Sequence, residues 1–351
     1  MLDIEARLAR QAIGIAVDKA LEDMKGNARR SIRNLVDLGA LFSQSENQKW
    51  FFATAKKVID SPKNPYRALV SRAVRDIDGD TIRRVGLNLG YNALVHGAKR
   101  LRRRQDAPDA RLPWLLDMTA RGASAGPRLD ACLTEGQEMG IYAYALRPDG
   151  AEALNATLDL AQKHGDCFLA LRLPSELLEG DAPERIARAH NVAVAVELPC
   201  GPGQAEGAFR RLAENRCLFG FLLTYGDEDV RSVTSSRFVR WGIGEGCLFG
   251  AYQAAAGASQ RARDSVHAFV CRLRGEAGRP LIALDWPRDV REAGEKLGVG
   301  GVLNLDLAAA AMTLCRDARS AGGALAEFCD GRRPVLRHSA LKRRAGSGPP
   351  F

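Results

Sequence analysis

The pattern of apolar and polar residues changes near residue 113. Before this point, apolar residues recur every three or four positions, as in Ile13, Val17, Leu21 and Met24, and this spacing predicts amphipathic helices. After it, short apolar runs alternate with longer amphipathic stretches. Such alternation predicts strand–helix units that form a parallel sheet. The chain is therefore expected to be an α/β protein with a helical N-terminal part.

The N-terminal pattern predicts an all-helical subdomain over residues 1–105, with a linker at 106–112. One helix is expected around 13–24, another over 28–43, and a long one from Thr81 to about Arg104, which Asp78-Gly79-Asp80 would cap. The linker contains two aspartates and a proline. Proline and short polar side chains favour turns over regular structure.

The strand-like runs begin at Pro113. Six of them predict a partial (β/α)6 TIM-like barrel over 113–278: 114–118, 141–146, 167–172, 192–197, 218–224 and 247–252. Two further runs, 280–285 and 301–305, are assigned to a degenerate C-terminal extension over 279–330. The last segment, 331–351, has six basic and no acidic residues and is expected to be a disordered tail.

Charge is distributed unevenly along the chain. Residues 1–110 hold 21 basic and 13 acidic residues, whereas 111–331 hold 24 basic and 29 acidic ones. A basic patch is expected at the end of the long helix, formed by Lys99, Arg100, Arg102, Arg103 and Arg104. Such a patch is attracted to nucleic acid, but cations also stabilise a helix C-terminus, and we favour that second interpretation.

The cysteines and histidines indicate no metal site. Eight cysteines and five histidines are scattered, without a CxxC, HxH or HExxH pair. No apolar run reaches the roughly 18 residues of a membrane span, and the N-terminus lacks the apolar core of a signal peptide. We therefore expect a cytoplasmic protein with reduced cysteines, no bound metal and no contact with a membrane.

Several phrases of the chain resemble one family of enzymes. They cover residues from about 80 to 315 and read PWLLDMT (113–119), EGQEMGIYAYAL (135–146), KHGDCFLAL (163–171), LFGFLLTY (218–225) and LIALDWPRDV (281–290). In their order and content they resemble bacterial radical S-adenosylmethionine (SAM) proteins that have an N-terminal helical region and a SPASM-like C-terminal extension. The resemblance implies a barrel with an iron–sulfur cluster held by CxxxCxxC in the loop after the first strand.

This chain departs from that family at each of the implied cofactor sites. The loop after the first strand reads ARGASAGPR and holds no cysteine; Cys132 comes later. A Gly-Gly-Glu-Pro run that would contact SAM is replaced by Leu146-Arg147-Pro148-Asp149-Gly150, and the extension keeps only Cys315 between 292 and 315. A four-iron cluster needs several thiolates. We therefore expect a degenerate relative without the cluster, in which SAM binding is in doubt.

Two functions from different classes follow from this resemblance. The first is a pseudoenzyme that acts as a protein partner or scaffold and is not an active radical SAM enzyme. The alternative is an enzyme or binder of a small molecule or SAM-like nucleotide that reuses the barrel mouth without iron–sulfur chemistry. Binding of nucleic acid through the basic helix end is a weaker third alternative.

The candidate site residues lie where strands should end, because the mouth of a parallel barrel is at the carboxyl ends of its strands. They are Asp117, Thr119, Glu197, Thr224 and Asp285. No catalytic residue is assigned among them, and we favour the interpretation that they are remnants of an older pocket. Gly201 and Gly203 precede a helix and could cradle a phosphate, although a plain turn explains the same glycines.

Overall fold

The computed structural model describes most of the chain. The described residues are 4–41, 49, 53, 56–57, 65–105, 112–122, 125–198, 205–276, 279–286, 288–307, 311–314 and 320–321. The predicted tail, 331–351, lies outside these residues, as does most of the linker.

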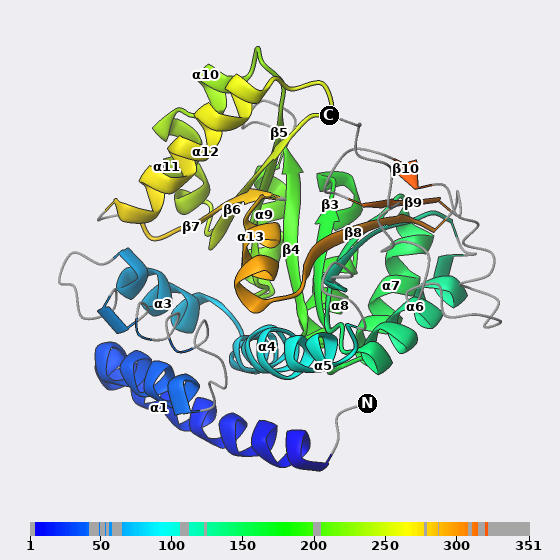
Figure 1. The fold of residues 1–351 in the computed structure, drawn as a ribbon. Helices are drawn as coiled ribbons and strands as arrows, with labels where there is room; N and C mark the ends of the chain where they lie inside the picture. Colours follow the sequence, from blue (N-terminus) through cyan, green and yellow to red (C-terminus); the bar gives the residue numbers. More distant parts are fainter. Residues whose placement is uncertain are drawn as a thin grey trace, which may run out of the picture.

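Eight parallel strands form one curved sheet, which is central in Figure 1. Its order is β8-β1-β2-β3-β4-β5-β6-β7, with β9 and β10 added in antiparallel fashion beyond β8. The strands are β1 (Pro113–Ala120), β2 (Ala143–Pro148), β3 (Phe168–Leu173), β4 (Val192–Leu198), β5 (Phe219–Tyr225), β6 (Phe249–Ala254), β7 (Ile282–Trp286), β8 (Gly300–Asp306), β9 (Ala311–Leu314) and β10 (Ser320–Ala321). This is the predicted partial TIM-like barrel.

The sheet is larger than the six predicted strands because β7 and β8 belong to it. β7 pairs in parallel with β6, and β8 pairs in parallel with β1. The division at residue 279 therefore cuts through one continuous sheet. β7 and β8 do not pair with each other, so the barrel stays open at this seam. Helix α13 (Arg288–Leu297) connects the two strands and contacts both.

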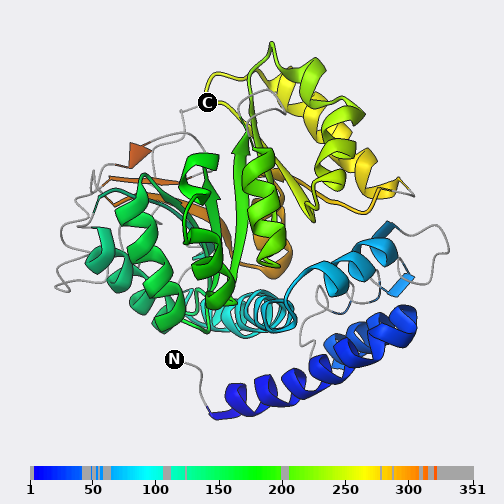
Figure 2. The same cartoon turned by 180° about the vertical axis from the view of Figure 1, so that it is seen from behind.

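Helices cover the outside of the sheet, as the views from the front and behind show (Figures 1 and 2). They are α6 (Ala125–Met139), α7 (Ala151–Lys163), the 3₁₀ helix η2 (Ser175–Leu178), α8 (Ala182–Ala189), α9 (Glu206–Glu214), α10 (Val230–Val233), α11 (Ser236–Gly244) and α12 (Gln260–Gly275). The strands between them are largely buried on both faces, which explains why β4 reads VAVAVEL. None of the described helices is long and apolar enough to cross a membrane.

The concave face of the sheet carries small side chains over its lower part. Ala143, Ala145, Ala170, Ala195 and Ala251 alternate with the large residues that face the outer helices, such as Tyr144 and Val196. Ala195 and Ala251 pack with Leu222 and Leu284 on this face. The charged residues of the same alternation, near the carboxyl ends, line a cavity.

The N-terminal helices lie beneath the sheet (Figure 1). The two helices expected over 13–24 and 28–43 are one helix, α1 (Ile4–Leu41), which packs on α3 (Pro65–Asp76). The predicted long helix is a continuous run of α4 (Gly79–Val85), a π-helix η1 (Gly86–Gly97) and α5 (Ala98–Arg103). Asp78 caps its start by accepting the Thr81 N–H at 3.0 Å.

The π-helix closes the amino end of the barrel. It contacts β1, β2 and β3, and its buried Asn88 donates hydrogen bonds to the carbonyls of Gly165 (2.9 Å) and Cys167 (2.8 Å). At its end, a Cβ on Gly97 would lie 2.3 Å from the carbonyl oxygen of Gly140, so only glycine allows this approach. The helical region is therefore packed against the barrel and closes its lower end.

Candidate functional site

A cavity of about 1020 Å³ opens at the carboxyl ends of the strands. We call it the barrel mouth. Its walls come from β1 to β6, β8 and the segment after β3: Asp117, Thr119, Arg147, Arg172, Pro174, Ser175, Glu176, Glu197, Leu198, Leu222, Thr224, Gln253, Ala254, Ala255, Ala256, Asn304, Leu305 and Asp306. Four of the five predicted mouth residues, Asp117, Thr119, Glu197 and Thr224, line it together. The cavity lies at the end of the barrel where such folds bind their ligands.

Asp117 and Arg172 form an ion pair at the wall of the barrel mouth. Arg172 Nη2 lies 2.5 Å from Asp117 Oδ1, which joins β1 to β3 across β2. Both side chains are mostly buried, with exposed fractions of 9% for Asp117 and 13% for Arg172. Burial raises the pKa of Asp117, while the charge of Arg172 and a hydrogen bond from Trp286 oppose that rise. The Trp286 bond reaches Asp117 across the open seam.

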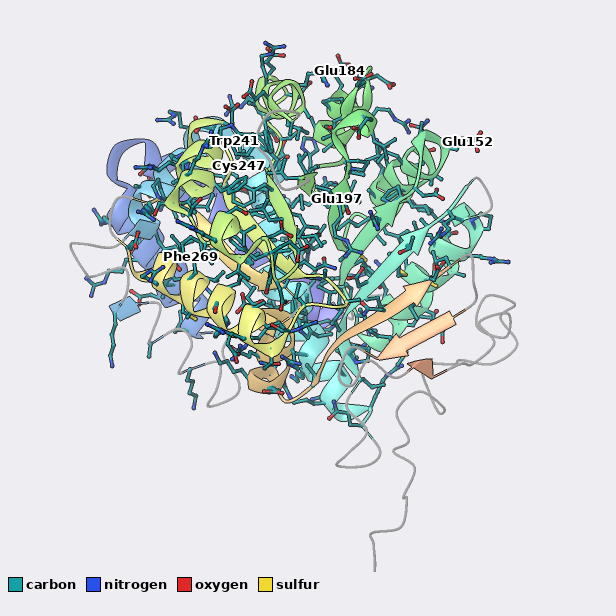
Figure 3. The ribbon with its side chains drawn as sticks, turned by 90° about the horizontal axis from the view of Figure 1, so that it is seen from above. Glu152, Glu184, Glu197, Trp241, Cys247 and Phe269 are labelled. Carbon is teal, nitrogen blue, oxygen red and sulfur yellow. The ribbon has the colours of Figure 1, made fainter. Side chains whose placement is uncertain are left out.

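A second ion pair lies nearer the solvent. The Arg147 guanidinium binds the Glu197 carboxylate through two contacts, Nε–Oε1 at 2.9 Å and Nη2–Oε2 at 3.0 Å. Figure 3 shows Glu197 near the centre of the molecule, whereas Glu152 and Glu184 lie on outer helices. This bidentate geometry fixes both groups in orientation. It also links β2 to β4, so the two pairs cross on the concave face.

The barrel mouth holds both positive and negative groups, with the arginines of β2 and β3 between carboxylates on either side. Four carboxylates (Asp117, Glu176, Glu197 and Asp306) share the cavity with two arginines. Arg121 adds a third cation at the rim, with its Nη2 3.4 Å from Asp306. Hydroxyl and amide side chains from Thr119, Thr224, Gln253 and Asn304 complete the wall. A molecule that carries both charges would find a partner for each.

The structure does not bring Asp285 into the barrel mouth. Asp285 follows Leu284, and consecutive side chains of a strand point to opposite faces. Leu284 packs with Ala195 and Leu222 on the concave side, whereas Asp285 hydrogen-bonds His267 of α12 at 2.8 Å on the outer side. The prediction that Asp285 lines the barrel mouth is therefore wrong.

The other candidate groups are placed as follows. Gly201 and Gly203 lie outside the described residues. In the basic patch, Arg100 donates to the carbonyl of Glu138 (2.6 Å) and Arg102 to that of Leu297 (2.6 Å). Burial lowers the pKa of Arg102. At least these two cations hold α5 against neighbouring segments, as expected for a helix C-terminus packed on a domain.

The residues after β1 do not fit an iron–sulfur cluster. Residues 113–131 contain no cysteine, and Cys132 is fully buried in the core on α6. Among the described residues, no cysteine lines the barrel mouth. The only metal-like group of the described residues is Asp78, Asp80 and His190, whose ligand atoms lie within 4.8 Å of one another. These residues are partly exposed, and Asp78 already caps α4.

Comparison with known proteins gives weak structural matches. No family model matches the chain, and no curated protein matches it. Among solved structures, Streptococcus suis SuiB bound to S-adenosylmethionine matches with 8% identity and a TM-score of 0.47, over 66% of this chain and 65% of that one. The matched part is thus slightly less than two thirds of that SuiB chain.

Two further solved structures show the range of the matches. Another structure of Streptococcus suis SuiB has 8% identity and a TM-score of 0.47, over 85% of this chain and 73% of that one. A 2,3-dimethylmalate lyase has 14% identity and a TM-score of 0.32, over 60% and 78%. All three scores are below 0.5. The assignment of the fold therefore depends on the strand order and register of this chain.

Two arginines that organise the barrel mouth were not predicted from the sequence. Arg147 and Arg172 each lie one residue before the end of a strand, in ALRP and ALRL, where every other residue is apolar or proline. A charged residue within an apolar run was a visible signal. This signal did not identify the partner of either arginine. Asp117 lies 55 residues from Arg172 in the sequence, and Glu197 lies 50 residues from Arg147.

Proposed function

We propose that this chain binds a small zwitterionic molecule in the barrel mouth and does so without iron–sulfur chemistry. The observation that carries the proposal is the cavity of about 1020 Å³ with Arg147 bound to Glu197 and Arg172 bound to Asp117 in its wall. Ligand sites are commonly concave and contain a few fixed polar groups. Here the fixed groups are two acid–base pairs.

The pairs indicate what the ligand would carry. A carboxylate of the ligand can bind Arg147 in place of Glu197, and an ammonium group of the ligand can bind Glu197 in place of Arg147. Both protein charges are then still paired, which avoids the cost of leaving a charge alone in a partly buried site. A purely anionic ligand that binds Arg147 leaves Glu197 without a partner, and a purely cationic ligand that binds Glu197 leaves Arg147 without one. An amino-acid moiety satisfies both.

SAM and two of its fragments test this proposal. SAM and S-adenosylhomocysteine share an amino-acid moiety, whereas adenosine lacks it. Ligand at about 1 mM with a dissociation constant of about 10 µM should add about 2.7 kcal/mol to the unfolding free energy, which a thermal shift detects. We expect stabilisation by the first two and not by adenosine. Equal stabilisation by adenosine, or none by any of the three, would refute the proposal.

A matched pair of double variants locates the site. Arg147→Gln with Glu197→Gln removes both charges of the outer pair, and binding should weaken about thirtyfold, since hydrogen bonds between charged groups contribute about 2 kcal/mol. Arg188→Gln with Glu184→Gln removes an ion pair of the same type from the outer face of α8, where Figure 3 shows Glu184. Binding should be unchanged in this control.

The absence of a cluster is part of the same proposal and has its own test. The three positions that the resemblance assigns to thiolates are occupied by residues of the ARGASAGPR loop. Anaerobic incubation with iron and sulfide, followed by desalting, should leave no stoichiometric iron and no visible absorbance. A stable cluster would overturn this part and leave the test with zwitterionic ligands intact.

We keep a protein-partner function as a second proposal, because helix α1 exposes apolar side chains. Leu8 and Ile15 are each 63% exposed and are two turns apart on the same helix face. Exposed apolar residues that share one face mark interaction surfaces. A stoichiometric partner that co-purifies with the wild-type chain should be lost from Leu8→Glu/Ile15→Glu. Its retention by that variant would contradict a role for α1.

A further inference from the structure

Three side chains on the outer face of the barrel form a Cys–His–Asp arrangement. His267 Nδ1 lies 2.8 Å from Asp285 Oδ2, and His267 Nε2 lies 3.3 Å from the sulfur of Cys271. His267 and Cys271 are one turn apart on α12, and Asp285 comes from β7. The three residues are scattered over 19 positions of the sequence, and no short motif marks them.

The roles within this arrangement follow from hydrogen-bonding capacity. An ionised carboxylate only accepts hydrogen bonds, so Nδ1 of His267 carries the hydrogen that binds Asp285. In the neutral ring, Nε2 then has a free electron pair directed at Cys271, and it accepts the S–H. A thiol next to a base that a third group orients is the general form of an activated nucleophile.

The carboxylate that orients His267 is itself held firmly. Its exposed fraction is 9%, and the backbone N–H of Asp285 donates to Asp289 at 2.7 Å. Arg274 of α12 binds the same Asp289 carboxylate and donates to the carbonyl of Ala283 at 2.9 Å. α12, β7 and α13 are thereby joined around Asp285. The position of the imidazole is fixed by the fold and does not depend on a mobile surface contact.

Cys271 differs from the other described cysteines in its access to solvent. Cys132, Cys167, Cys217 and Cys247 are buried, whereas Cys271 is exposed. Burial raises the pKa of Cys217 to about 12 and raises the pKa values of Cys167 and Cys247 as well, so these thiols stay protonated. Nucleophilicity and access therefore coincide at Cys271 among the described residues.

The surroundings of Cys271 also limit what it can react with. The thiol lies on the exposed side of α12, and the barrel mouth, which is lined from the concave face, does not include it. Arg272 is its neighbour in the chain, with its guanidinium 5.5 Å from the centre of the Phe269 ring. Figure 3 labels Phe269 on this outer helix. An exposed thiol outside the cavity is accessible to small electrophiles from solvent.

We propose that Cys271 is a modification site at which His267 activates the thiol toward small disulfides such as oxidised glutathione. The thiol proton moves to His267 Nε2 and the sulfur attacks one sulfur of the disulfide. A new S–S bond forms to Cys271 while the disulfide S–S bond breaks and releases one thiolate, which takes up a proton. The small disulfide is the oxidant, and no further reactant is needed. The site is independent of the barrel mouth.

The rate of mixed-disulfide formation at Cys271 tests this proposal. The full-length chain is incubated with oxidised glutathione, quenched with acid, and the peptide containing Cys271 is quantified by mass spectrometry. His267→Gln should slow the reaction about tenfold at neutral pH, because a smaller thiolate fraction outweighs the higher nucleophilicity of a more basic thiol. Asp285→Asn should slow it less. Cys271→Ser should abolish the signal, which identifies the site.

The pH profile separates activation from a merely structural effect. Charged and titratable groups surround the pair on several elements: Asp285 from β7, Arg288 and Asp289 from α13, Arg274 from α12 and the neutral phenol of Tyr225 from β5. They are the same in the wild type and in His267→Gln. Loss of activation should move the half-maximal rate to higher pH without lowering the maximum at high pH. A local distortion would lower the maximum without moving the midpoint.

A second histidine supplies the matched control. His190 also contacts an aspartate, with Nδ1 3.2 Å from Asp78 Oδ1, but it lies at the C-terminus of α8 and not on α12. His190→Gln should leave the Cys271 rate and its pH midpoint unchanged. The proposal is overturned if His267→Gln reacts like the wild type, or if Cys271 in the folded chain reacts no faster than in guanidinium at the same pH.

Discussion

The two ends of the barrel bury polar groups of different kinds. At the amino end, Asn88, Asn92 and Asn191 are fully buried and donate to backbone carbonyls of the segment 161–167. At the carboxyl end, the buried groups are the charged pair Asp117–Arg172 beside a cavity.

Neutral amides can be buried at low cost when they are hydrogen-bonded, whereas buried charges lose much hydration energy even when paired. The amino end is thus built for stability. The carboxyl end keeps an arrangement that stability alone does not require, and this difference is the reason for placing the ligand site there.

The largest expected effect is at the amino end. Asn88→Ala removes the donors to the carbonyls of Gly165 and Cys167 and the acceptor of Arg10 Nη2 at 2.8 Å. Asn92 donates to the same side chain, so four hydrogen bonds of about 1 kcal/mol each are lost and the unfolding free energy should fall by about 4 kcal/mol. Urea denaturation measures this. Gln162→Ala on the exposed face of α7 should change it by less than about 0.5 kcal/mol.

If Asn88→Ala unfolds within about 1 kcal/mol of the wild type, water has replaced the amide. The amino end would then be as hydrated as the carboxyl end, and the contrast between the two would disappear.

The next effect is at the carboxyl end. Arg172→Met keeps the length of the side chain but leaves the Asp117 carboxyl buried without its cation. Breaking a buried pair by removing one partner costs about 3 kcal/mol, measured in the same denaturation experiment. Arg188→Met removes an arginine that is 68% exposed and pairs with Glu184, and it should cost less than about 0.5 kcal/mol. Equal losses in the two variants would show that the pair is solvated.

Much of the fold could be predicted because it depends on local periodicity. The alternation of short apolar runs with amphipathic stretches predicted the parallel sheet, and all eight runs that were noted became strands of it. The sequence did not show that 280–285 and 301–305 join the same sheet as the first six. That result depends on pairing with β6 and β1, between segments far apart in the chain.

The residues of the candidate site could be predicted only as accurately as the ends of the strands could be located. Asp117, Thr119, Glu197 and Thr224 reach the barrel mouth because they occur near the carboxyl ends of strands. Asp285 occurs at an equivalent place and yet faces outward, because a shift by one residue reverses the face. The ends of apolar runs locate a strand to within a residue or two. This precision does not determine which face of the sheet a given side chain points to. Contacts such as His267 with Asp285 follow from the tertiary fold alone.

The smallest effect gives the most direct test of charge at the carboxyl end. Because burial raises the pKa of Asp117, the folded chain holds this proton more tightly than the unfolded chain does. Stability from this group therefore rises as pH falls through the folded-state pKa and levels off below the ordinary value of 3.8. Asp117→Asn resembles the protonated form at every pH. It should be more stable than the wild type at pH 7, and the two should converge in acid.

Asp130 provides a control of opposite sign. Hydrogen bonds from Lys163 and His164 lower the pKa of Asp130, so its carboxylate stabilises the folded chain above the ordinary pKa and that contribution is lost as pH falls through the folded-state value. Asp130→Asn should therefore be less stable than the wild type at pH 7 and converge with it in acid from below. Urea denaturation between pH 3 and 8 separates the two signs. An Asp117→Asn curve that also lies below the wild type at pH 7 would mean that Arg172 outweighs burial, and that the carboxyl end is stabilised by its charges as the amino end is by its amides.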